Sequence, residues 1–221
     1  MKKHAYLIMA HNNWKILEKL LILLDDKRND IYLHIDLKSD FIDFSSKVHN
    51  ANLFIFHEID VRWGDISLIQ VEFFLFKTAY CKGNYSYYHL ISGSDLPLKT
   101  QDEIHAFFDA HYPTEFIGFS LGMTCDNRIN KVYIFPKYQR IKNRYGNIGN
   151  SFLFNSVYDK VDDYKGCMRF IDWNKGNPYI FRSIDFEQLM SSDRMFARKF
   201  DEKVDFDIVE RIFEALDKQK R

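Results

Sequence analysis

The chain has 221 residues, of which 46% are hydrophobic, 28% are charged and 17% are aromatic. This composition excludes a disordered chain and predicts one large folded domain with a sizeable core. Lys and Arg together number 31, as do Asp and Glu, so the formal net charge is zero. A chain without excess positive charge has no global attraction to nucleic acid, so a nucleic-acid partner is not expected.

Cysteine usage and the N-terminus indicate a cellular location. The three cysteines, Cys81, Cys125 and Cys167, form neither a zinc-binding spacing nor a disulfide framework, which is typical of a reducing compartment. The apolar run at residues 5–10 follows a basic start but is too short for a signal peptide or a membrane span. We therefore expect a cytoplasmic protein, and a position at the inner face of the membrane stays open.

Strand and helix patterns alternate through the first half of the chain. A continuous apolar run at residues 6–10 is typical of a parallel strand covered on both faces, and leucines spaced i, i+3, i+4 and i+7 over residues 17–24 then predict a helix. The same patterns predict further strands at 31–35, 52–56, 87–91 and 115–119, and helices at 67–80, after the capping box Thr100–Glu103, and at 209–216. This alternation predicts an α/β fold with a mainly parallel sheet flanked by helices in a single domain.

Polar side chains follow three of the predicted strands at the point where each strand ends. They include His11 after the first, Asp36 after the second and Asp95 after the fourth. The carboxyl ends of parallel strands share one edge of a sheet, so these side chains are expected to converge around a polar ligand. For each residue taken alone, capping of the next helix is an equally good explanation.

A metal site is not expected. The one DxD string, Asp205-Phe206-Asp207, could hold a divalent ion, but it opens the terminal helix, where acidic residues suit the helix dipole. The eight histidines show no metal-ligand spacing.

Blocks of residues spread over most of the chain carry a family resemblance. They are LIMAH at 7–11, IYLHIDLKS at 31–39, WGDISL at 63–68, LISGSDLPLKT at 90–100, RFIDW at 169–173 and the segment 189–205 around FARKFD. In this order they resemble the core-2/I-branching β-1,6-N-acetylglucosaminyltransferases (the Branch family), the group that also contains the peptide O-xylosyltransferases.

The resemblance implies a GT-A-like, Rossmann-like fold and a glycosyltransferase of glycan biosynthesis. It implies transfer of N-acetylglucosamine or xylose from a UDP-sugar, with inversion at the anomeric carbon and with no metal or other cofactor. The expected acceptor is a glycan or a lipid-linked glycan, the latter with peripheral membrane association. Residues 1–120 are expected to bind the nucleotide-sugar, and residues 121–221 the acceptor and the phosphates.

Three cations are candidates for the diphosphate of the donor. Lys199 matches the position of the family's phosphate-binding lysine, and Arg198 and Arg182 are weaker candidates for the same charge. Fixed Lys and Arg side chains can stabilise a departing diphosphate in place of a metal ion.

Five further residues match positions around the donor. Ala10, His11 and Asp36 match the lining of the nucleoside pocket. Asp95 matches the acid of the G-x-D-x-P turn, which is close to the donor. Trp63 is expected to shape the pocket floor, although a role in packing alone explains it equally well.

The expected general base has no counterpart. In the family, a long stretch before the RFIDW block contains an Asp-Glu pair whose Glu is the expected base, whereas here Lys165-Gly166 runs almost directly into that block, so the acceptor half is shortened near residue 166. Inversion by direct displacement needs a base near the attacking hydroxyl. Glu115 and Asp172, with Asp163 as a further acid, are the candidates. Two alternatives remain open: a non-catalytic family member that binds UDP-sugar or glycan, and an unrelated nucleotide-binding α/β protein.

Overall fold

The computed structural model describes residues 3–62, 65–116, 131–133, 151–153, 167–174 and 177–218. The chain forms two compact units, one of Met1–Pro113 with Met168–Arg221 and one of Thr114–Cys167. In the second unit, β6 (Lys131–Tyr133) pairs antiparallel with β7 (Ser151–Leu153). The division into these two units does not test the prediction that residues 1–120 bind the nucleotide-sugar and residues 121–221 bind the acceptor and the phosphates.

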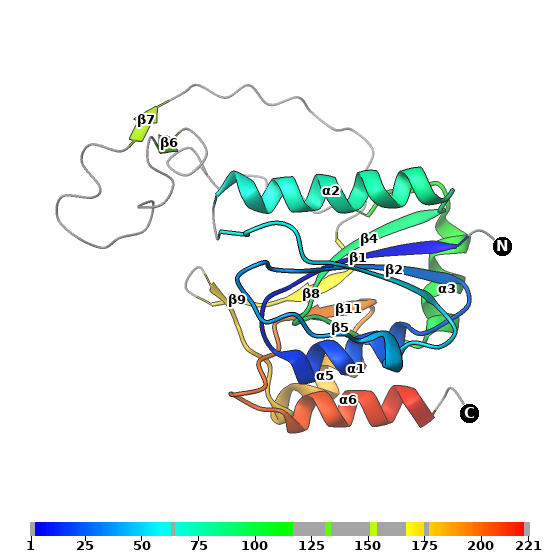
Figure 1. Ribbon diagram of the computed structural model, residues 1–221. Coiled ribbons are helices and arrows are strands. Elements are labelled where there is room, and N and C mark those ends of the chain that lie inside the picture. Colours follow the sequence, from blue (N-terminus) through cyan, green and yellow to red (C-terminus); the bar gives the residue numbers. More distant parts are fainter. Residues whose placement is uncertain are drawn as a thin grey trace. The chain divides into compact units, whose positions relative to one another are not determined.

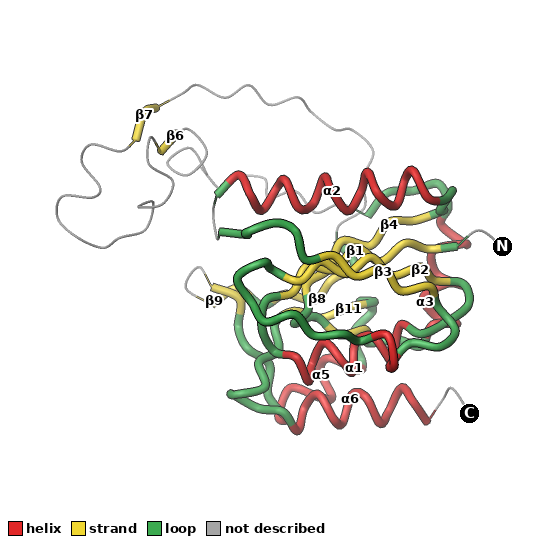
Figure 2. The backbone as a smooth tube through the Cα atoms, viewed as in Figure 1, coloured by secondary structure: helices red, strands yellow, loops and turns green. Residues whose placement is uncertain are grey.

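A four-stranded parallel sheet forms the centre of the first unit (Figures 1 and 2). Its strands are β1 (His4–Ala10), β2 (Asn29–Ile35), β3 (Asn52–Phe56) and β4 (Tyr87–Ser92), in the order β3-β2-β1-β4. Every residue of β2 is buried, including the polar Asn29, Asp30 and His34, as in a parallel strand that is covered on both faces. The predictions of these four strands and of a mainly parallel α/β fold are confirmed.

Helices cover both faces of this sheet. In Figure 1, α2 (Ile66–Lys82) lies over one face, and α1 (Trp14–Leu24) and α6 (Asp207–Asp217) lie on the other. The leucines of α1 that are spaced i, i+3, i+4 and i+7 are all buried. Their spacing in the sequence therefore predicts which side of the helix faces the sheet. Lys19 of α1 forms an ion pair of 3.0 Å with Glu210 of α6, which ties the two helices together.

The helix α3 (Gln101–His111) begins as its capping box predicts. The Thr100 hydroxyl accepts the backbone N–H of Glu103 at 3.3 Å, and the Glu103 carboxylate accepts the backbone N–H of Thr100 at 2.7 Å. The helix packs at the amino ends of β1 and β2, where His105 contacts Asn29.

A second, smaller sheet was not predicted. It has the order β5-β11-β8, with β11 (Phe196–Arg198) antiparallel to β5 (Leu96–Pro97) and parallel to β8 (Arg169–Ile171). These strands have two or three residues each, which is too short for any periodicity. The sheet brings segments about 100 residues apart in the chain side by side.

Short elements lie between β8 and β11 in the chain. They are β9 (Trp173–Asn174), β10 (Asn177–Pro178), η3 (Ser183–Asp185) and α5 (Phe186–Met190), while η1 (Ser45–Lys47) precedes β3. Of the strand predicted at 115–119, the structure describes Glu115, which is exposed and outside any strand, and Phe116; residues 117–119 lie outside the described part.

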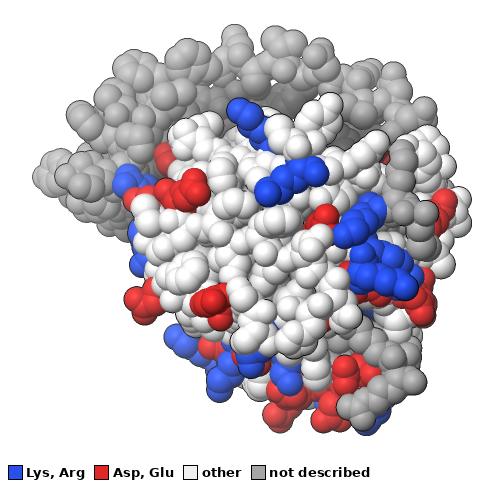
Figure 3. All heavy atoms as spheres, turned by 45° about the vertical axis from the view of Figure 1, so that its right-hand side comes forward, with Lys and Arg blue, Asp and Glu red and all other residues white. Residues whose placement is uncertain are grey.

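The described surface contains charges of both signs. On the face drawn in Figure 3, Lys and Arg lie beside Asp and Glu without a broad patch of one sign. Among the described residues, no helix combines the length and the apolar character that a membrane crossing requires.

Candidate functional site

The carboxyl ends of β1 and β2 form the base of the candidate site. The two strands end side by side at Ala10 and Ile35, and the backbone N–H of Asp36 donates to the carbonyl of Ala10 at 2.8 Å. Packing here is tight, because a Cβ on Gly93 would lie 2.8 Å from the Cβ of Ala10. A glycine after β4 therefore lets this strand end approach β1 closely.

Asp36 is a buried acid with fixed partners. Its Oδ1 accepts the backbone N–H groups of Lys38 and Val61, each at 3.1 Å. The Lys38 ammonium lies 3.4 Å from Asp36 Oδ2 and 2.8 Å from Asp60. Asp36 thus holds the backbone at Lys38 and at Val61 in place, and the Lys38 ammonium lies beside its carboxylate.

His11 lies at the surface, where its ring is only partly desolvated, within the field of several charges. Partial burial lowers the pKa of its ring; the Asp36 carboxylate opposes this shift, and the charges of Lys199, Lys38 and Arg198 add to it. The neutral ring is therefore the favoured form at pH 7. Charges from both ends of the chain thus act on this ring, while the binding of a ligand by His11 and Asp36 stays a prediction.

Arg198 and Lys199 follow one another at the end of β11. The backbone here is fixed, because Phe181 N–H donates to the Lys199 carbonyl and Phe200 N–H donates to the Ser94 carbonyl, each at 3.0 Å. Within the described part of the chain, neither cationic side chain has a hydrogen-bond partner, and the Nε of Arg198 is buried. Two neighbouring cations on a fixed backbone are suited to binding an anion.

Asp95 is brought to the same strands but is wholly buried. Its carboxylate accepts the Ser92 hydroxyl at 2.7 Å and the Ser92 backbone N–H at 3.0 Å. Arg169 and Arg198 are its ionic partners. Sequence reasoning missed Arg169 as a site residue, since only the pairing of β8 with β11 brings it here.

The remaining predicted residues are more scattered. Arg182 is exposed, and its backbone N–H donates to Asp185 at the start of η3. Asp172 is exposed between β8 and β9, and its carbonyl accepts the Tyr179 N–H at 2.7 Å. Glu115 belongs to the unit Thr114–Cys167. Trp63 and Asp163 lie outside the described residues. The roles expected for these residues stay predictions.

The DxD string has a structural role. Asp205 accepts the backbone N–H and the hydroxyl of Ser183 and also the backbone N–H of Ile208, and Asp207 lies in the first turn of α6. Across the described ranges, no group of three or more His, Cys, Asp or Glu side chains could hold a metal ion.

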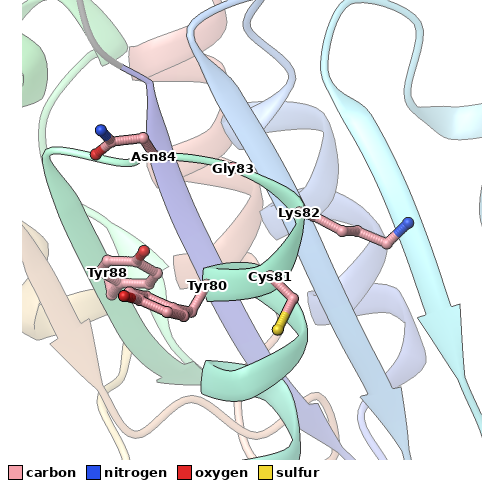
Figure 4. A pocket seen from close by; sticks show the side chains of 6 residues that line it. All are labelled: Tyr80, Cys81, Lys82, Gly83, Asn84 and Tyr88. Carbon is pink, nitrogen blue, oxygen red and sulfur yellow. The ribbon is translucent and has the colours of Figure 1, made fainter.

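A hollow of about 480 Å³ lies away from this site, at the C-terminal end of α2 (Figure 4). It is lined by Tyr80, Cys81, Lys82, Gly83, Asn84 and Tyr88. In Figure 4 the Lys82 side chain extends away from the two tyrosines, and its ammonium lies 4.4 Å from the centre of the Phe54 ring. Because the hollow is at the amino edge of the parallel strands, we do not assign the donor to it.

The comparisons with known proteins agree with the sequence blocks. The sequence model of the family described as Core-2/I-Branching enzyme matches residues 4–212, which is nearly the whole chain. No curated protein matches the chain.

Proposed function

Because the chain belongs to the Core-2/I-branching enzyme family, a family of glycosyltransferases with this GT-A-like α/β fold, we propose that it transfers a sugar from a UDP-sugar donor. The transferred sugar is N-acetylglucosamine or xylose, and the configuration at the anomeric carbon is inverted. The acceptor is a hydroxyl group of a glycan or of a lipid-linked glycan. The reaction takes place in the cytoplasm, at the inner face of the membrane for a lipid-linked acceptor.

The observation that carries the proposal is the pair of cations at the end of β11. Arg198 and Lys199 lack hydrogen-bond partners in the described part of the chain, and both act on the His11 ring at the carboxyl edge of the sheet. A UDP leaving group gains negative charge as the glycosidic bond breaks, and fixed cations stabilise that charge in the transition state. Lys199 is accordingly assigned to the diphosphate, with Arg198 beside it and exposed Arg182 as a third cation.

The strand ends suit the nucleoside of the donor. Ala10, His11 and Asp36 form one continuous edge, and the largely neutral His11 ring offers one hydrogen-bond donor and one acceptor to a polar base or ribose. Trp63 is proposed to close the floor of this pocket.

The proposed reaction uses no metal ion. The positive charge at the diphosphate is supplied by side chains, and the one DxD string is committed to Ser183 and to α6. The base that removes the proton from the acceptor hydroxyl is proposed to be Glu115 or Asp172.

The decisive experiment is a donor panel. Transfer and hydrolysis are measured for UDP-N-acetylglucosamine, UDP-xylose and other UDP-sugars on glycan acceptors, with EDTA and with added Mn²⁺ or Mg²⁺. We expect turnover of one UDP-sugar that EDTA leaves unchanged. Turnover that requires a divalent ion would contradict the metal-free part of the proposal, and the absence of UDP binding in calorimetry would contradict all of it.

A non-catalytic protein that binds UDP-sugar or glycan is the second candidate. The observation that favours it is the short connection at Lys165-Gly166, where the family's base-bearing stretch has no counterpart. UDP binding without any transfer on the same panel would support this second candidate.

A further inference from the structure

A buried ion cluster lies behind the cations of the proposed donor site. Its centre is Asp95, whose carboxylate is 0% exposed. Arg198 Nε lies 3.9 Å from Asp95 Oδ1, and Arg169 Nε lies 3.4 Å from Asp95 Oδ2. Ser92 donates one hydrogen bond to each oxygen. A single internal anion is therefore shared between two arginines.

The two arginines are held differently. The Arg169 side chain is 18% exposed, is closer to the carboxylate and donates a further hydrogen bond to the carbonyl of Leu90. The Arg198 side chain is 36% exposed and makes no hydrogen bond within the described part of the chain. Arg169 is thus fixed at two points, whereas Arg198 is oriented by Asp95 through its buried Nε, and none of its N–H groups forms a hydrogen bond within the described part of the chain.

This difference has an electrostatic consequence. A buried carboxylate with one cationic partner gains most from close contact with that cation, because the contact offsets the cost of desolvating both charges. Without Arg169, Asp95 would draw Arg198 onto itself and occupy the N–H groups that could reach a ligand.

We propose that Arg169 and Asp95 are positioning residues for the donor diphosphate. Arg169 neutralises Asp95, and Asp95 then orients Arg198 toward the phosphates without binding it tightly. Asp95 therefore acts through Arg198 rather than by contact with the donor. This inference rests on the proposed function, because it assigns Arg198 to a UDP leaving group.

The test is a double-mutant cycle read by calorimetry with UDP and with uridine. The variants are Arg169→Gln, Arg198→Gln and their combination. We expect Arg169→Gln to weaken UDP binding about 10-fold, as for loss of a charged hydrogen bond, and to leave uridine binding unchanged. In the Arg198→Gln background the same substitution should have no further effect on UDP. The proposal is overturned if the loss of UDP affinity in the double variant equals the product of the two single losses. It is also overturned if UDP and uridine lose affinity equally.

Two further variants separate positioning from folding. Arg169→Lys keeps the positive charge beside Asp95. It should therefore fold even if Arg169→Gln fails to fold, and it should retain part of the preference for UDP over uridine. If it folds but binds UDP no better than uridine, although the charge beside Asp95 is kept, the proposal is wrong. Arg194→Gln, which alters an arginine paired with Asp193 just before β11, is the control and should leave both affinities unchanged. A wild type that binds UDP no better than uridine would instead refute the proposed function itself.

Discussion

Lys199 provides the most direct test of the site at the scale of single residues. Its backbone is fixed by Phe181, and its ammonium has no hydrogen-bond partner in the described part of the chain. We expect Lys199→Ala to weaken UDP binding by about 10–150-fold, because a charged hydrogen bond to phosphate contributes about 1.5–3 kcal/mol. Uridine, which lacks phosphate, should bind as before, as calorimetry can establish.

A control for this substitution is available in the same segment. Lys203 is exposed four residues further along, so Lys203→Ala removes the same charge at a different place. It should leave the affinity for UDP within a factor of about two, as expected for a surface charge. Equal losses of uridine and UDP affinity in Lys199→Ala would mean that Lys199 supports the fold rather than the phosphates.

The general base is the second question at this scale. Glu115→Gln and Asp172→Asn each remove one candidate carboxylate with little change in shape, and both residues are exposed, so folding should be preserved. A positioned base contributes about 10²–10⁴-fold in rate, so we expect the variant of the true base to lose that much turnover at unchanged UDP affinity. Wild-type turnover of about 10 per second with both variants fully active would exclude both residues.

Sequence reasoning accounts for part of this site. His11, Asp36 and Lys199 could be selected because strand ends and the FARKFD block identify them, and the structure joins the segment that contains Lys199 to the turn after β4 through the hydrogen bond from Phe200 to Ser94. The burial of Asp95 could not be foreseen, because it depends on the pairing of β5, which follows Asp95 directly, with β11, and of β11 with β8. Arg169 was missed for the same reason.

At the scale of secondary-structure elements, three histidines join β1, β4 and α3. His4 Nδ1 lies 3.1 Å from His89 Nε2, and the His4 ring stacks on that of His105 at 4.0 Å. Burial, with the charges of His105 and Arg28, lowers the pKa of His4 to about 3. Burial also lowers the pKa of His89 and of His105. All three are therefore neutral in the folded protein near pH 7.

This cluster makes stability depend on pH. The unfolded chain takes up protons on these histidines below about pH 6.5 while the folded chain does not, so the free energy of unfolding should fall as pH decreases from 6.5 toward 3. For His4, whose pKa in the folded protein is about 3, this lowers the free energy of unfolding by about 1.4 kcal/mol at pH 5.5. Urea unfolding measured between pH 7.5 and 5 should show this decline, above the range in which most carboxylates titrate.

Two variants isolate the contribution of the cluster. His4→Gln should reduce the pH slope by about one proton, whereas His49→Gln, at an exposed residue of a loop, should leave the slope unchanged. His34, whose pKa burial lowers to about 4, adds to the slope in all three proteins. A free energy of unfolding that is constant over this pH range would contradict the prediction.

The elements themselves differ in how far the sequence predicts them. The strands β1 to β4 have five to seven residues and clear apolar runs, and α1 and α6 have clear periods, so each was predicted close to its observed bounds. The strand β5 pairs with β11 about 100 positions further along the chain, and neither the length nor the composition of β5, β8 or β11 indicates a partner.

At the scale of the whole molecule, the proposed donor site joins the two ends of the chain. Ala10, His11 and Asp36 come from the first 36 residues, and Arg198 and Lys199 from the last 24. All of them belong to the unit that combines Met1–Pro113 with Met168–Arg221.

The place of β11 in the middle of its sheet has a consequence for synthesis on the ribosome. The four strands of the main sheet emerge within the first 92 residues, but β5 has no partner until residues 196–198 have been translated. Domains fold as units, and their N-terminal parts fold first. The nascent chain therefore contains all four strands of the parallel sheet while Asp95, just after β4, still lacks its two arginine partners. Under the proposed function, UDP gains its phosphate contacts only after Arg198 and Lys199 have been translated, and a chain that ends before residue 196 has an open β5 edge.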